Sequence, residues 1–141
     1  MKIEKRETEI KTAFFERFDE LFTIRQFFVQ HNQDVRKSGW PDTIIHGFTH
    51  ATSWEFKHGT PNFSSPGIQE ITCCRIARHS YCRYVIFFET AHEQKTLIAH
   101  PRHVLDKNGK THDIQIEVEF DGFAFDQLAA FIHAIHNPER P

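Results

Sequence analysis

The order of the periodic segments in this chain predicts an α/β fold: a helix, three strands, a helix, a strand, and then a hairpin and a last helix. Apolar residues recur at helical spacing near both ends of the chain, and they alternate at every second position in segments between them. The chain has 141 residues, 39% of them apolar, and 15 Phe, which is enough for a packed core. We therefore expect residues 1–141 to form a single domain.

The N-terminal half is predicted to form a helix and three strands, over residues 4–22, 24–31, 42–48 and 53–58. In the helix, Ile10, Phe14 and Phe18 fall on one face at a spacing of four residues. The first strand is rich in aromatic and β-branched residues, and Pro41 suits the entry to the second. The second and third strands would pair as a hairpin whose turn lies around residues 48–50.

The C-terminal half is predicted to form a helix, three strands and a final helix, over residues 66–79, 84–89, 96–104, 114–120 and 125–136. Ser65-Pro66 is typical of an N-cap followed by the first helical residue. Residues 106–109 contain Asn-Gly, the expected turn between the two strands of the second hairpin. Apolar and polar residues alternate along 114–120, so one face of that strand should lie in the core.

The segment 41–57 contains the residues that point to chemistry. In a strand, Glu55 and Lys57 share one face, and pairing that is symmetric about the turn sets Asp42 roughly opposite Glu55. Two carboxylates held together favour a shared cation, and Mg²⁺ prefers oxygen ligands. We therefore expect Asp42 and Glu55 to bind Mg²⁺, with Mn²⁺ as a substitute and the carbonyl of Phe56 as a further ligand. Lys57 would then contact the attacking water or the phosphoryl oxygens.

A Gly-x-Pro-Asp strand, a Glu-x-Lys strand and a Gln on the next helix follow one another here as Gly39-Trp40-Pro41-Asp42, Glu55-Phe56-Lys57 and Gln69. Over residues 31–88 this order and spacing resemble the PD-(D/E)XK nuclease superfamily, and within it the VRR-NUC and Holliday-junction-resolvase-like branch. The resemblance implies a restriction-endonuclease-like core of helix, three strands, helix and strand. The C-terminal hairpin and helix are additions to that core.

The resemblance also implies roles for single residues. It makes Asp42 and Glu55 the metal ligands, Lys57 the catalytic lysine and Gln69 an accessory residue. Some members place a Glu of the first helix in the site, and Glu9 stands at about the right remove. The other acidic residues that this helix offers for the same place are Glu7, Glu16 and Glu20.

The expected function is that of a Mg²⁺-dependent nuclease that hydrolyses phosphodiester bonds of DNA, branched or junction DNA included, by in-line attack of an activated water. DNA and RNA, and endonuclease and exonuclease action, stay open as alternatives. The alternative of another class is a non-catalytic module that keeps this fold and binds nucleic acid or a protein. The intact set of Asp42, Glu55 and Lys57 favours the enzyme.

Charge and composition bound the partners. A formal net charge of −2 predicts a modest affinity for nucleic acid. A second subunit in a homodimer, or a partner protein, is therefore expected to assist the binding. Basic residues that could gather into one positive surface are Arg36, Lys37, Arg75, Arg78, Arg83, Arg102, Lys107 and Lys110. No apolar run approaches the roughly 20 residues of a membrane helix. Residues 1–5 suggest a charged helix rather than a signal peptide, and three cysteines suggest a reducing, cytoplasmic location.

Other readings of the same residues stay open. The tripeptide Glu55-Phe56-Lys57 also suits an ordinary solvated edge strand, and Gln69 an ordinary solvated helix. Histidines near the hairpin and further along the chain suggest a zinc site, although no Cys-x-x-Cys accompanies them. Those histidines are His46, His50, His58, His100 and His103. Cys73 and Cys74 lie mid-helix, where packing is a better explanation than nucleophilic chemistry.

Overall fold

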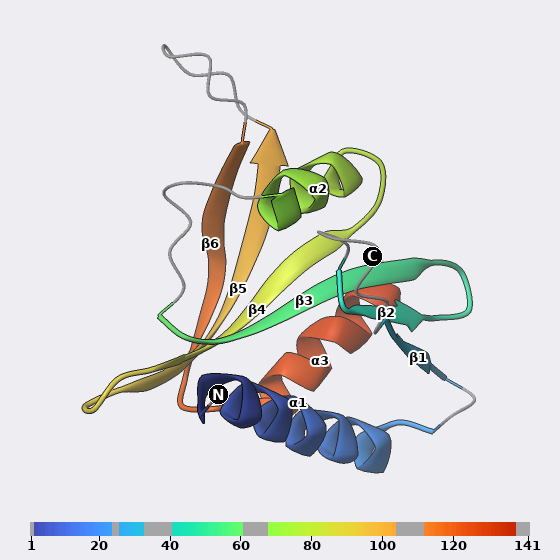
Figure 1. Ribbon diagram of the computed structural model, residues 1–141. Coiled ribbons are helices and arrows are strands. Elements are labelled where there is room, and N and C mark those ends of the chain that lie inside the picture. The colour runs from blue at the N-terminus through green and yellow to red at the C-terminus, as the bar shows by residue number, and fades with distance from the viewer. Residues whose placement is uncertain (1, 24–25, 33–40, 61–67, 104–111, 138–141) are drawn as a thin grey trace.

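The computed structural model describes residues 2–23, 26–32, 41–60, 68–103 and 112–137, over which three helices and six strands follow one another (Figure 1). The helices are α1 (Lys2–Leu21), α2 (Ile68–Ala77) and α3 (Phe125–His136). The strands are β1 (Phe28–His31), β2 (Thr43–His46), β3 (Ala51–Gly59), β4 (Cys82–Glu89), β5 (Gln94–His103) and β6 (His112–Asp121). The fold is therefore α/β, as the sequence predicts.

All six strands join one mixed sheet in the order β1-β2-β3-β4-β5-β6. Strands β3 and β4 run parallel, and every other described pair is antiparallel. A parallel pair needs a crossover connection, and α2 lies in that connection between β3 and β4. The β2–β3 hairpin turns tightly, since the Gly47 N–H donates to the His50 carbonyl at 2.9 Å. The expected turn around residues 48–50 is confirmed.

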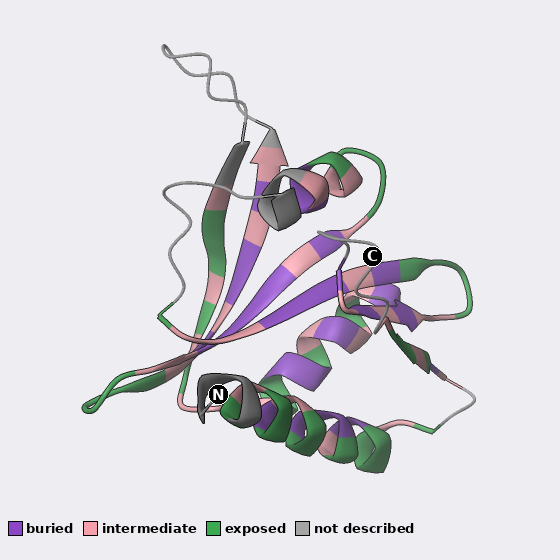
Figure 2. Cartoon of the chain, in the orientation of Figure 1, coloured by how far each residue is buried: buried purple, intermediate pink, exposed green. Residues whose placement is uncertain are grey.

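Helices cover both faces of the sheet, with α2 on one side and α1 and α3 on the other (Figure 1). Strand β4 shows the consequence, because side chains on both of its faces are buried (Figure 2). Val85 and Phe87 join the core beneath α1 and α3, whereas Tyr84 and Ile86 join a smaller core beneath α2. The sheet therefore separates two apolar cores, and each helix closes one of them.

The larger core is mostly aromatic. Phe14 and Phe18 of α1 are fully or almost fully buried, and the ring centroids of Phe14 and Phe56 lie 6.0 Å apart. Burying one such side chain contributes about 1.5–3 kcal/mol, so the helical Phe stripe is what holds α1 against β3. Leu128 and Ile132 bring α3 into the same cluster.

The observed boundaries confirm most of the predicted elements. Helix α3 has the predicted bounds, and α1 lies within two residues of the prediction at its N-terminus and one at its C-terminus. Strand β1 starts later than residue 24, because Thr23 and Gln26 form a turn in which the Gln26 N–H donates to the Thr23 carbonyl at 2.9 Å. The predicted turn at residues 106–109 lies outside the described residues. No described helix combines the length and the apolar composition needed to cross a membrane.

Candidate active site

The β2–β3 hairpin sets Asp42 opposite Glu55, as the sequence predicts. The described register pairs Thr43 with Trp54, so Asp42, one residue before β2, continues the ladder toward Glu55. The Asp42 N–H donates to Glu55 Oε1 at 3.0 Å. The backbone of Asp42 is thus joined directly to the side chain of Glu55.

The site lies where β3 extends beyond the end of its pairing with β2. On one side β3 pairs with β4 from Ser53 to Gly59, but on the other side the pairing with β2 ends at Trp54. Residues 55–59 therefore have no strand partner on that side in the described sheet. Glu55 and Lys57 lie on this half-open stretch, where a substrate can approach without breaking the sheet. The backbone of Phe56 lies on the same stretch while its ring is buried in the larger core.

The Glu55 carboxyl group is buried, and its pKa is raised to about 8. Burial is the main cause, and the negative charge of Asp42 adds to it, while Lys57 partly offsets both. The hydroxyl of Thr43 donates to Asp42 Oδ1 at 2.8 Å. Without a shared cation, the Glu55 carboxyl is therefore held largely neutral at pH 7. A pair of carboxyl groups in this condition gains most from a bound cation.

Two lysines approach the carboxylates from different elements. Lys57 Nζ lies 3.8 Å from Glu55 Oε2, on the same strand. Lys11 of α1 places Nζ 3.2 Å from Asp42 Oδ1 and 5.4 Å from the centroid of the Phe56 ring. Each carboxylate thus has an ammonium group beside it. The sequence motifs do not include Lys11; the available signal was its spacing of four residues from Glu7, which puts both side chains on one face of the helix.

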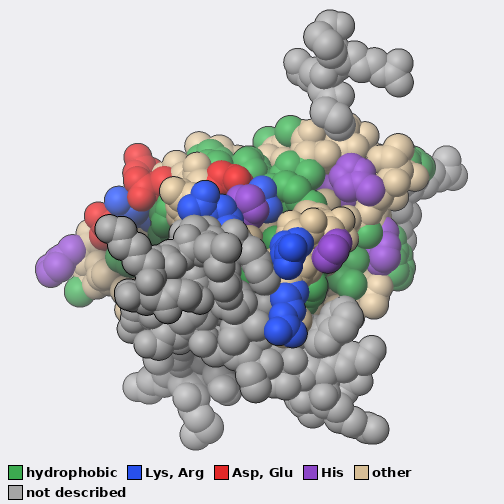
Figure 3. Space-filling view, turned by 90° about the horizontal axis from the view of Figure 1, so that it is seen from above, with side chains coloured by type: hydrophobic (Ala, Val, Ile, Leu, Met, Phe, Trp, Pro, Cys, Tyr) green, Lys and Arg blue, Asp and Glu red, His purple; other side chains and the backbone are tan. Residues whose placement is uncertain are grey.

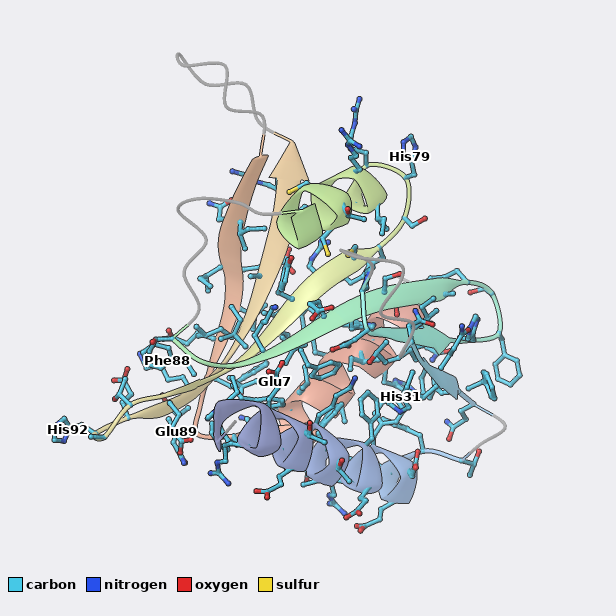
Figure 4. All side chains as sticks on the ribbon, in the orientation of Figure 1. Glu7, His31, His79, Phe88, Glu89 and His92 are labelled. Carbon is cyan, nitrogen blue, oxygen red and sulfur yellow. The ribbon has the colours of Figure 1, made fainter. Side chains whose placement is uncertain are left out.

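The structure brings Glu7, rather than Glu9, to this cluster. Burial raises the pKa of Glu7, and Lys57, Asp42 and His58 act on that pKa through their charges. Figure 4 shows Glu7 between α1 and the sheet. Glu9 is exposed. Two residues along a helix correspond to a rotation of about 200°, so these two glutamates face nearly opposite directions.

A hydrogen-bonded network at the far end of β3 borders the cluster. His58 Nε2 lies 2.7 Å from Glu89 Oε1, and Gln94 donates to the other oxygen of Glu89 at 2.7 Å. These bonds, with Arg6, hold the pKa of Glu89 down at about 2. Figure 4 shows Glu89 near the β4–β5 end of the sheet. The network links β3, β4, β5 and the first turns of α1.

A pocket of about 420 Å³ opens beside Asp42, between α1 and the end of β1. Glu7, Lys11 and Phe15 line its helical wall, and His31 faces them from β1. Burial and the charge of Lys11 lower the pKa of His31. The pocket gives a ligand a route to Asp42 that is separate from the open edge of β3.

The donor set suits a hard cation. Among the described residues, no group of three or more His, Cys, Asp or Glu side chains is arranged to hold a metal ion. Mg²⁺ does not require such a group, because it is bound by one or two carboxylates and completes its coordination with water and substrate oxygens. Asp42 and Glu55, already in contact, fit that requirement. The same finding gives no support to a zinc site at His46, His50, His58 or His100.

The remaining sequence candidates have plainer positions. Gln69 lies in the first turn of α2, and its side chain is outside the described part of the chain. Cys73, Cys74 and Cys82 are buried thiols outside any disulfide. The pKa of Cys82 is strongly raised by its hydrogen bond to Cys73 and by burial, so it stays a neutral thiol. Cys73 and Cys82 pack in the smaller core.

Basic side chains gather with histidines on the face seen in Figure 3. The pKa of His100 is lowered mainly by burial. The charges of Arg83 and Arg102 lower it further. Arg83 donates to Glu117 at 3.0 Å and lies 4.1 Å from the centroid of the Tyr81 ring. The charge of Arg83 is therefore partly neutralised within the protein.

Comparison of the chain with protein-family models and with the sequences of curated proteins returns no match.

Proposed function

We propose that this protein is a Mg²⁺-dependent nuclease that hydrolyses phosphodiester bonds of DNA. The convergence of Asp42, Glu55 and Lys57 at the half-open edge of β3 is the observation that carries the proposal. A buried carboxyl group with a pKa near 8 adds little to the stability of a fold, but it suits a site that binds a cation.

The arrangement of the elements supports the same proposal. The element order α1, β1, β2, β3, α2 and β4, with β4 parallel to β3, agrees with the helix, three strands, helix and strand that the sequence resemblance leads us to expect, and this agreement supports the proposal. In this proposal β5, β6 and α3 are additions: β5 and β6 extend the sheet on the side away from the site, and α3 packs beside α1. In this proposal the candidate residues Asp42, Glu55 and Lys57 belong to that core rather than to the additions.

Each side chain has a definable task. Asp42 and Glu55 would hold the cation through their carboxylate oxygens, with the Phe56 carbonyl as a further ligand. When bound, the cation supplies Lewis-acid stabilisation of the phosphate and activates the attacking water. Lys57, next to Glu55 on the open edge, would stabilise the charge that develops on the phosphoryl oxygens. Glu7 would orient the attacking water from α1.

The proposed substrate is DNA, including branched or junction DNA. The net charge of −2 and the partly neutralised Arg83 limit the affinity for a long nonspecific duplex. A substrate that presents an opened or branched strand can place one phosphate at the edge of β3 without an extended positive surface. A second subunit or a partner protein would supply further contacts.

A second candidate function is a non-catalytic module that binds nucleic acid or a protein. One observation favours it: Lys11 and Lys57 already lie beside the two carboxylates. A site neutralised in this way is stable without a cation. The two functions differ in whether the purified protein binds Mn²⁺ and cuts.

The deciding experiment is a panel of labelled duplex, single-stranded, flapped and four-way-junction DNAs, incubated with Mg²⁺, Mn²⁺ or EDTA. Asp42→Asn and Glu55→Gln should abolish cleavage and weaken Mn²⁺ binding measured by calorimetry. Glu119→Gln, an exposed change of the same charge on β6, is the control and should cut like the parent. Cleavage that persists in EDTA, or in both carboxylate variants, would refute the proposed function.

Lys57→Ala separates binding from chemistry. It should leave Mn²⁺ binding intact or tighter, because a neighbouring positive charge is gone, and reduce turnover by about a hundredfold to a thousandfold, the effect of removing one preorganised charge from a transition state. Turnover at the parental rate under saturating Mg²⁺ would favour the binding module instead.

A further inference from the structure

We propose that Lys11 works in two positions: it neutralises Asp42 in the cation-free site, and it binds a phosphate of the nucleic-acid chain once a divalent cation occupies Asp42. This inference rests on the proposed nuclease function. It gives α1 a part in choosing the substrate, beyond the residues of the β2–β3 hairpin.

The first position is the observed one. Lys11 Nζ lies 3.2 Å from Asp42 Oδ1, and its side chain is 20% exposed. The ammonium lies over the Phe56 ring, 5.4 Å from the centroid. The buried rings of Phe14 and Phe15, which pack on Phe56, fix this part of α1. Lys11 is thus held at the site by the larger core rather than by a loose surface contact.

Lys11 and a divalent cation compete for the same oxygen atoms. Asp42 is one of only two carboxylates proposed to hold the cation, and the Lys11 ammonium repels any other positive charge brought to it. The contact between Lys11 and Asp42 must therefore loosen when the cation binds. Removing the charge of Lys11 should tighten cation binding, although Lys11 is not itself a ligand.

The second position follows from what surrounds Lys11. Its flexible side chain lines the pocket of about 420 Å³ beside Asp42, so a released ammonium still faces that space. Glu16 and Asp19 also line the pocket, and their charges repel a free anion. A phosphate can enter where Lys11 offsets that repulsion and where the rest of a polymer holds it in place. The ligand class is therefore a phosphodiester within a strand, and not inorganic phosphate.

The cation half of the proposal is tested with Mn²⁺ alone. Lys11→Met keeps the apolar stem over Phe56 and removes the charge. Its Mn²⁺ dissociation constant, measured by calorimetry, should fall by at least roughly fivefold, because two unit charges about 4 Å apart in water already have an effect of that size and Mn²⁺ carries two charges. Lys95→Met is the charge-matched control on β5, where Lys95 pairs with Glu93 and Glu119, and it should bind Mn²⁺ like the parent.

The phosphate half is tested with a fluorescently labelled DNA duplex in Ca²⁺, by anisotropy over a range of salt concentrations. Lys11→Met should weaken binding roughly tenfold or more and lower the slope of log K against log salt by about one contact. Lys11→Arg should restore both the affinity and the slope. Inorganic phosphate, added as a competitor while the total ionic strength is held constant, should not displace the duplex.

The outcomes separate this inference from the proposed function. A parent that binds neither Mn²⁺ nor the duplex refutes both. A parent that binds and cuts, while Lys11→Met matches it in Mn²⁺ affinity or in salt slope, overturns the role of Lys11 alone. A parent that binds Mn²⁺ and DNA, shows both effects of Lys11→Met and cuts no substrate leaves the role of Lys11 standing and removes the nuclease. Lys11→Gln repeats the test if the methionine variant melts early.

Discussion

At the scale of single residues, α1 carries two glutamates, Glu7 and Glu9, that serve as a test and its control. Glu7 is partly buried beside Asp42 and Lys57, whereas Glu9 on the same helix is exposed. Glu7→Gln should therefore lower the turnover of DNA by about a hundredfold or more, in the range that a positioned acid or base contributes. Glu9→Gln should cut at the parental rate. Equal losses in both variants, measured with the best substrate at saturating Mg²⁺, would contradict this assignment.

The sequence could place Asp42 and Glu55 together but could not place Glu7 and Lys11. The first pair is fixed by a short hairpin, whose turn determines which residues face each other. The second pair depends on the rotation and height of α1 against the sheet. That docking is decided by the packing of Phe14 and Phe15 on Phe56, which no local pattern specifies.

The imidazole of His136 makes the stability of the folded protein depend on pH in the acid range. It is buried, with Nε2 2.8 Å from the Thr52 hydroxyl, and burial, followed by the charges of His50 and His133, lowers its pKa from 6.5 to about 4. Above pH 6.5 the imidazole is neutral in the folded and unfolded states and contributes no pH dependence. Between pH 6.5 and 4 the unfolded chain takes up a proton that the folded protein does not, so stability is lost as the pH falls.

The loss amounts to at most about 3 kcal/mol, since one pKa unit corresponds to about 1.4 kcal/mol. His136→Gln should therefore lose less melting temperature than the parent between pH 7 and pH 5. His79→Gln, at an exposed histidine, is the control and should follow the parent. Thermal melts at the two pH values measure the difference, and equal losses in parent and His136→Gln would contradict it.

At the scale of elements, the end of α3 packs against the β2–β3 hairpin so closely that position 47 has room only for a glycine. A Cβ added to Gly47 would lie 2.5 Å from His136 Nδ1, closer than any real contact. Gly47→Ala should therefore destabilise the protein by about 1–3 kcal/mol, the usual range for overpacking. Urea unfolding measures the change. In a His136→Ala background the same substitution should be nearly neutral, and an equal cost in both backgrounds would show that the clash is not the cause.

The elements differ in how well the sequence predicts them. Helix α3 could be predicted to the residue, because Leu128, Ala129 and Ile132 repeat at helical spacing between clear ends. The start of strand β1 could not, because the sequence before Phe28 is as apolar as the strand itself, and the bond from the Gln26 N–H to the Thr23 carbonyl is a turn contact that no local pattern predicts. The parallel pairing of β3 with β4 depends on where α2 packs, which is a property of the folded chain.

At the scale of the whole molecule, the two cores share one sheet and should unfold together. Phe14→Ala removes a side chain with 0% exposure that packs on Phe15, Phe18, Phe56 and Phe125. It should destabilise the protein by about 3–5 kcal/mol. Far-ultraviolet and near-ultraviolet circular dichroism should report one coincident urea transition, because β4 contributes side chains to both cores.

Phe28→Ala is the matched control. Its ring is 60% exposed on β1, so its removal should change the free energy of unfolding by no more than about 0.5 kcal/mol. A loss comparable to that of Phe14→Ala, or two separate transitions in the parent, would contradict a shared sheet as the source of cooperativity.

The far edge of the sheet governs how copies of this protein behave at high concentration. Strand β6 has ten residues and one neighbouring strand in the described part of the sheet, so its outer backbone edge can pair with another chain. Glu117 and Glu119 place negative charge along that edge, partly balanced from inside by Arg83 and Lys95. Two such edges repel each other at neutral pH. Replacing both glutamates with valine should convert β6 into a template for fibrils, visible as thioflavin fluorescence and light scattering that the parent does not show.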